Sequence, residues 1–172
     1  KGMKKLIPGS AITVVREGTR PIVSEIESLV SSSFTPYPSR ISDTMKKEQL
    51  NTLVSVMEQR CGINLFDKNV VIKSTGGIKL KEPSVNLAVI MSIASSYYNK
   101  SIPDDCVFIA DVGLTGELKK VPLMDSRLKE LERREYKKVF VAGRADETLK
   151  KGVGCKVIGC ETLKDVIEIF FK

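Results

Sequence analysis

The segment Lys81-Glu82-Pro83-Ser84-Val85-Asn86 leads directly into an apolar run that continues to Ala94. Pro83 suits the first turn of a helix, because the N–H group that proline lacks would have no helical partner there. Nearly every residue from Val85 to Ala94 is apolar, which predicts a helix that is buried on most of its sides. We therefore expect this helix to be the centre of the fold, with Ser84 at its start.

A second motif, Gly113-Leu114-Thr115-Gly116-Glu117, follows after one predicted strand. A serine at the start of a buried helix beside a glycine-rich turn is how a Ser-Lys peptidase presents its nucleophile, because free backbone N–H groups there can stabilise an oxyanion. The chain contains no histidine, which excludes a Ser-His-acid triad. Only a lysine with a lowered pKa or a carboxylate could activate Ser84.

Length and composition indicate a single soluble domain. The 172 residues, 42% of them hydrophobic, are enough for one full core and too few for two large ones. No apolar stretch approaches the ~20 residues that cross a bilayer, so we expect no membrane partner. The net charge of +7 favours a polyanionic partner, although dispersed solvated lysines would produce the same charge.

The four cysteines are widely scattered and lack the Cys-x-x-Cys spacing of a zinc site. We expect no metal ion and no disulfide, and we interpret the cysteines as buried thiols in a reducing compartment. The residues concerned are Cys61, Cys106, Cys155 and Cys160.

The pattern along the chain predicts an α/β fold. Residues 1–8 have no periodicity and are interpreted as a linker or edge, so the domain is expected over residues 9–172. Ala11 to Arg16 and Pro21 to Leu29 predict a hairpin, and Leu50 to Cys61 an amphipathic helix. Strands and helices then alternate. The strands are expected at Val70–Ile72, Cys106–Ala110, Val139–Ala142 and Lys156–Ile158, and the helices at Asp125–Arg134 and from Thr162 onward.

Several short blocks occur in order along the chain. They are Pro8-Gly9-Ser10-Ala11, Glu17-Gly18-Thr19-Arg20-Pro21, Glu58-Gln59-Arg60-Cys61-Gly62, Gly76-Gly77, Glu82-Pro83-Ser84, Asn86-Leu87-Ala88 and Val112-Gly113-Leu114-Thr115-Gly116-Glu117. Together they resemble the C-terminal domain of the RadA (Sms) family of bacterial DNA repair proteins, from about Pro8 to Ala142. The resemblance implies a Lon-protease-like fold, which is the ribosomal protein S5 domain 2-like fold of the α/β (α+β) class, in one domain.

The same resemblance implies a cytoplasmic partner of DNA. The family forms hexameric rings and acts with the RecA recombinase in ATP-dependent branch migration during recombination. ATP, Mg and Zn are expected only for its zinc finger and RecA-like ATPase, which lie outside this sequence. This domain would be an oligomerisation platform that contacts single-stranded or branched DNA through phosphates. The candidate contacts, chosen in loops and at helix starts, are Arg40, Lys46, Lys47, Lys79 and Lys81.

Ser84 aligns with the Lon nucleophile, and the position of the Lon catalytic lysine falls near Asp125. Lys129, one helical turn further on, is expected to be solvated among charged neighbours. A lysine base needs a pKa lowered by about three units, or ~4 kcal/mol. We therefore expect an inactive protease fold in which Ser84 is a vestigial, helix-capping serine. The alternatives are an active Ser-Lys peptidase and a ring scaffold without DNA contact.

Overall fold

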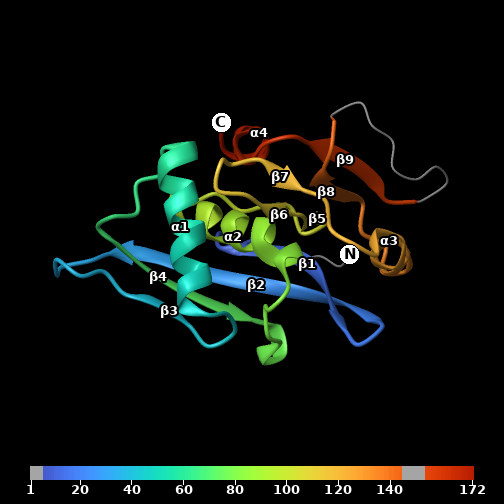
Figure 1. Ribbon diagram of the computed structural model, residues 1–172, viewed down its shortest axis with the longest axis horizontal. Helices are drawn as coiled ribbons and strands as arrows, with labels where there is room; N and C mark the ends of the chain where they lie inside the picture. The colour runs from blue at the N-terminus through green and yellow to red at the C-terminus, as the bar shows by residue number, and fades with distance from the viewer. Residues whose placement is uncertain (1–5, 145–153) are drawn as a thin grey trace.

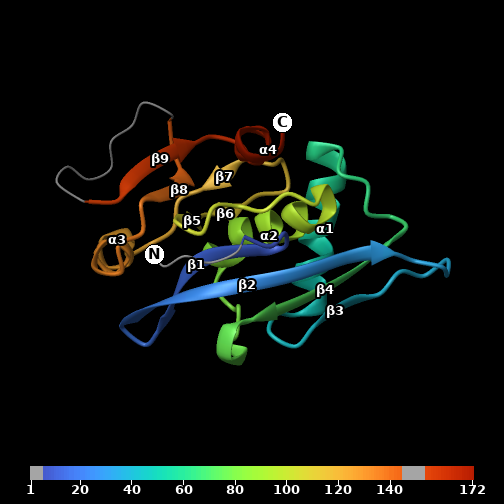
Figure 2. The same cartoon turned by 180° about the vertical axis from the view of Figure 1, so that it is seen from behind.

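The computed structural model describes residues 6–144 and 154–172, which form helices and strands of mixed α/β type. A four-stranded sheet lies on one side of the molecule and a three-stranded sheet on the other, with helix α2 (Asn86–Tyr98) between them (Figures 1 and 2). Of the predicted linker over residues 1–8, residues 1–5 lie outside the described residues. The first strand begins at Ser10.

The four-stranded sheet has the order β1-β2-β4-β3. The predicted hairpin is confirmed: β1 (Ser10–Glu17) and β2 (Arg20–Ser32) pair antiparallel around Gly18, whose φ of 62° suits glycine. Strand β4 (Lys68–Ser74) pairs antiparallel with β2, and β3 (Arg40–Ser42) pairs parallel with β4. The sequence pattern did not predict β3, because three residues are too few to show an alternation.

Helix α2 is the central helix, as its apolar run predicted. Every residue from Asn86 to Ser95 is buried, because the helix packs between the two sheets and against α1 (Lys47–Cys61) and α4 (Leu163–Phe171). Two short 3-10 turns precede it, η1 (Thr75–Gly77) and η2 (Pro83–Val85). The turn η2 carries Ser84 into the core beside the start of α2.

The second half of the chain has the predicted alternation. Its parallel sheet has the order β5-β8-β9, built from β5 (Cys106–Ile109), β8 (Lys138–Ala142) and β9 (Lys156–Cys160). Helix α3 (Met124–Arg133) precedes β8, and the short pair β6 (Asp111–Val112) and β7 (Leu118–Lys119) was not predicted. Helix α4 starts at the predicted capping sequence, where the Asp165 N–H donates to Thr162 Oγ1 at 3.2 Å.

The cysteines are free thiols, and Cys106, Cys155 and Cys160 are buried as predicted, whereas Cys61 is half-buried. Burial raises the pKa of Cys106 to about 12 and that of Cys155 to about 11. Thiols with such pKa values are poor nucleophiles at neutral pH. Across the described ranges, no helix is both long and apolar enough to pass through a membrane.

Candidate functional site

Ser84 is almost fully buried, with 2% of its surface exposed. Its Oγ donates a short hydrogen bond to Oε1 of Glu82. Helix α2 has no side-chain cap, and its N-cap residue is Val85. The predicted helix-capping role of Ser84 is therefore wrong, because the turn η2 directs the hydroxyl toward the Glu82 carboxylate instead of toward the N–H groups of α2.

Arg127 of α3 is the second group at the Ser84 hydroxyl. Its Nη1 lies 2.8 Å from Glu82 Oε1 and donates to Ser84 Oγ at 3.3 Å. The same nitrogen donates to the backbone carbonyl of Val14 at 2.7 Å, and Nε donates to that of Pro122 at 3.3 Å. Only 2% of Arg127 is exposed, so these contacts hold a buried guanidinium between α3, β1 and η2.

The electrostatics of this cluster weaken Glu82 as a base. Burial raises the pKa of the carboxyl, but hydrogen bonds from Ser84 and Arg127 and the charge of Arg127 together bring the pKa below its ordinary value. The backbone N–H of Arg16 also donates to Glu82 Oε2, at 3.2 Å. An arginine does not lose its proton in proteins. Neither group that contacts Ser84 Oγ is suited to accept its proton at neutral pH.

Three backbone N–H groups near Ser84 are already engaged in hydrogen bonds within the protein. The N–H of Val85 donates to the carbonyl of Glu82 at 3.3 Å, and that of Leu87 donates to the carbonyl of Ala110 at 3.1 Å. The N–H of Ala110 donates to the carbonyl of Ser84 itself at 3.3 Å. An oxyanion stabilised by these three N–H groups would have to displace their present hydrogen bonds.

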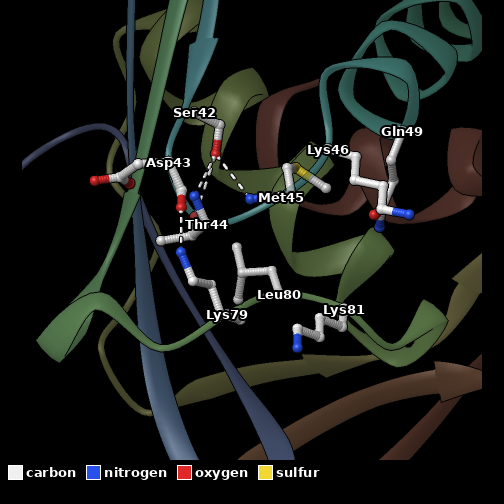
Figure 3. A pocket seen from close by; sticks show the side chains of 9 residues that line it. All are labelled: Ser42, Asp43, Thr44, Met45, Lys46, Gln49, Lys79, Leu80 and Lys81. Carbon is white, nitrogen blue, oxygen red and sulfur yellow. Dashed lines mark hydrogen bonds between the residues drawn. The ribbon is translucent and has the colours of Figure 1, made fainter.

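A second candidate site is an open pocket of about 660 Å³ at the start of α1 (Figure 3). We call it the lysine pocket, because three of its lining residues are lysines. Figure 3 shows that the segment over residues 42–49 faces the segment over residues 79–81 across the pocket. Its lining residues are Ser42, Asp43, Thr44, Met45, Lys46, Gln49, Lys79, Leu80 and Lys81.

Backbone and side-chain bonds hold the two walls of the lysine pocket together. The N–H of Leu80 donates to the carbonyl of Thr44 at 2.7 Å, and Lys79 Nζ donates to the carbonyl of Asp43 at 2.8 Å. Within the wall formed by residues 42–49, Ser42 Oγ accepts hydrogen bonds from the N–H groups of Thr44 and Met45, both at 3.2 Å. The pocket is therefore a defined feature of the fold and not a gap between loose side chains.

The five predicted DNA contacts do not all lie together. Lys46, Lys79 and Lys81 line the lysine pocket, and Lys47 is the first residue of α1 beside it. Arg40 in β3 instead donates to the carbonyls of Leu65, at 2.9 Å, and Lys68. Its guanidinium ties the loop before β4 to β3, which is a structural use that the sequence did not reveal.

Comparison with known proteins places the chain in a family. It is 34% identical to the DNA repair protein RadA of Streptococcus pyogenes over 163 residues, which are 95% of this chain and 36% of that relative. The chain belongs to the RadA family. It is 36% identical to RadA of Bacillus subtilis over 160 residues, 92% of this chain and 35% of the relative. With RadA of Listeria monocytogenes the identity is 32% over 160 residues, 93% of this chain and 35% of the relative.

The resemblance to RadA that the sequence blocks predicted is thus confirmed. This chain spans about a third of the length of the RadA relatives that it matches. No family model matches the chain.

In this RadA-family chain, sequence reasoning missed Arg127 as the cationic neighbour of Ser84. The sequence had placed the position of the catalytic lysine near Asp125 and predicted that Lys129 is solvated, and both residues are exposed on α3. A signal was present, because Arg127 lies four residues before the buried Leu131 and therefore on the inward face of the helix. A charged residue on that face needs buried partners, which only the fold identifies.

Proposed function

We propose that the chain is the C-terminal, Lon-protease-like domain of a RadA-type DNA repair protein, without peptidase activity. The observation that carries the proposal is the guanidinium of Arg127, which lies 3.3 Å from the Ser84 hydroxyl where a Ser-Lys peptidase needs a deprotonated amine. A guanidinium stays charged at any physiological pH, so it can only donate to the hydroxyl.

The role of this cluster is then structural. The guanidinium links α3 to η2 through the ion pair with Glu82, and it links α3 to β1 through the hydrogen bond to the Val14 carbonyl. These two contacts hold the three elements together around Ser84. Ser84 contributes a hydrogen bond to this network and is too buried for a peptide carbonyl to reach its oxygen.

DNA contact is the second part of the proposal. The name of the relatives supports a role in DNA repair, and the net charge of +7 together with the lysine pocket supports contact with phosphates. Lysines that neutralise phosphates bind without reading sequence. For the whole RadA-type protein we propose hexameric rings, action with the RecA recombinase and ATP-dependent branch migration. None of these is proposed for this domain alone.

An exposed aromatic tip supports the role of oligomerisation platform. Three aromatic side chains are largely exposed: Phe34 at 98%, Tyr37 at 85% and Phe66 at 68%. They lie on two loops, which are joined by a hydrogen bond of 2.8 Å from the N–H of Ser33 to the carbonyl of Asp67. These side chains expose on the order of 500 Å² of mostly apolar surface. Exposed aromatic side chains of this size are typical of interaction surfaces. We propose a second copy of this chain as its occupant.

Binding to single-stranded DNA as a function of salt tests the DNA contact. The three lysines of the pocket, by neutralising phosphate charge, predict a slope of log K against log salt that is steeper by up to roughly 2. Replacing Lys46, Lys79 and Lys81 by Gln should remove that part of the slope. The matched control is Lys129→Gln/Lys137→Gln/Lys164→Gln, which removes the same charge from exposed sites elsewhere. Equal slopes in the two triple variants would exclude the pocket as the DNA contact.

Two further measurements separate the alternatives. A fluorophosphonate probe should not label Ser84, and labelling that disappears in Ser84→Ala would establish an active peptidase. Light scattering should show association that weakens in Phe34→Ser/Tyr37→Ser. Association without any DNA binding at low salt would leave the pure ring scaffold as the function.

A further inference from the structure

We propose that the lysine pocket holds a terminal phosphate, that is, the dianion of a phosphate monoester at the end of a nucleic acid strand or on a free nucleotide. The inference rests on the proposed DNA contact and specifies its ligand. A phosphate within a strand carries one charge, whereas a terminal phosphate carries nearly two at neutral pH. Three properties of the pocket favour a terminal phosphate: its charge, its shape and the hydrogen-bond donors around it.

The lining of the pocket carries more positive than negative charge. Lys46, Lys79 and Lys81 come from two segments and line one pocket of about 660 Å³. Within residues 6–144 and 154–172, none of these three ammonium groups forms an ion pair with a carboxylate. The one acidic residue of the lining is Asp43, and Figure 3 shows its carboxylate directed away from the lysines. Three lysines and one aspartate leave a lining charge of +2, and this favours a dianion over a monoanion.

The shape of the pocket suits the end of a chain. A continuous strand follows the surface, where exposed lysines along a groove neutralise successive phosphates. The lysine pocket is instead a hollow between two walls, with a volume in the range of small-molecule sites. Leu80 and Met45 form part of its lining, and Met45 keeps 8% of its surface exposed, so an adjoining sugar or base would meet some apolar surface.

The donors around the pocket also match a phosphate. Thr44 and Ser42 bring hydroxyl groups, and Lys79 Nζ is held in place by its bond to the Asp43 carbonyl. Helix α1 is 15 residues long and begins at this pocket, and its N-cap residue Lys46 makes no side-chain cap. The N–H groups of its first turn add to the positive potential that the three lysines create.

The test compares two 12-nucleotide single strands of one sequence, with a 5′-phosphate or a 5′-hydroxyl, each labelled at the 3′ end. Fluorescence anisotropy with the 172-residue chain should show about tenfold tighter binding of the phosphorylated strand, the effect of one additional charge-assisted contact. The preference should disappear in Lys79→Gln/Lys81→Gln and persist in Lys129→Gln/Lys164→Gln. A parallel NMR titration with adenosine monophosphate tests the free nucleotide as the source.

The outcomes separate this inference from the proposed function. Equal binding of the two strands, still dependent on the pocket lysines, would keep the DNA contact and overturn the terminal-phosphate site. Lysine-dependent binding of adenosine monophosphate without binding of either strand would support the site and exclude DNA as its ligand. A 5′-phosphate preference that survives in Lys79→Gln/Lys81→Gln would overturn the assignment to this pocket, and no binding of any probe would overturn both proposals.

Discussion

Replacing Arg127 by Met should destabilise the domain strongly while leaving it folded. The substitution keeps an unbranched apolar stem but removes a guanidinium that donates to the carbonyls of Val14 and Pro122 and pairs with Glu82 at 2.8 Å. Breaking a buried ion pair by removing one partner costs about 3–5 kcal/mol, because the remaining charge and acceptors lose their partners. We expect ~3 kcal/mol, since the Glu82 side chain is 27% exposed and water can solvate part of it.

Urea unfolding at neutral pH measures this loss directly. A domain of this size has a total stability of about 5–15 kcal/mol, so the variant should still fold, with a Tm lower by roughly 10 °C. Arg133→Met on the same helix is the control, because the Arg133 ion pair with Glu130 is exposed to solvent and should contribute far less.

A double-mutant cycle with Glu82→Gln isolates the pair from the rest of the cluster. The stability lost in the double variant should be smaller than the sum of the two single losses, because either substitution alone already breaks the ion pair. Additive losses, or a stability of Arg127→Met within about 1 kcal/mol of the wild type, would refute the structural role of Arg127.

Three other predictions concern pH, thiols and glycines. The folded pKa of Glu82 lies below its ordinary value of 4.5. Its contribution to stability is therefore complete above pH 4.5 and is lost as pH falls through the folded pKa, so the urea unfolding curves of wild type and Glu82→Gln should converge as pH falls below 4.5. Burial raises the thiol pKa of Cys106 and Cys155, so Ellman's reagent should label them only in urea, and rapid native labelling would contradict their burial. Gly18→Ala, at φ 62° in open space, should cost about 1 kcal/mol in thermal unfolding. Gly9→Ala should cost clearly more, because at φ 107° its Cβ would lie 2.5 Å from the Ser28 carbonyl oxygen, and equal losses would refute that clash.

The candidate sites were only partly visible in the sequence. Ser84 was found from a local motif, and Lys46, Lys79 and Lys81 were chosen for their places in loops and at a helix start. The sequence could not show that the three lysines share one pocket, because the two segments that carry them are distant along the chain and come together through contacts such as the hydrogen bond between Leu80 and Thr44. Arg40 was chosen on the same grounds, yet its donors bind the carbonyls of a neighbouring loop.

The sequence by itself determined the elements whose signals are local. The apolar run of α2, the β1–β2 hairpin around Gly18 and the capping box at Thr162 each depend on residues within a few positions of one another, so periodicity and turn chemistry reveal them. Only the tertiary structure decided what surrounds Ser84. Arg127 and the Val14 carbonyl are 113 residues apart, and a buried charge obtains its partners only when the chain has folded around it.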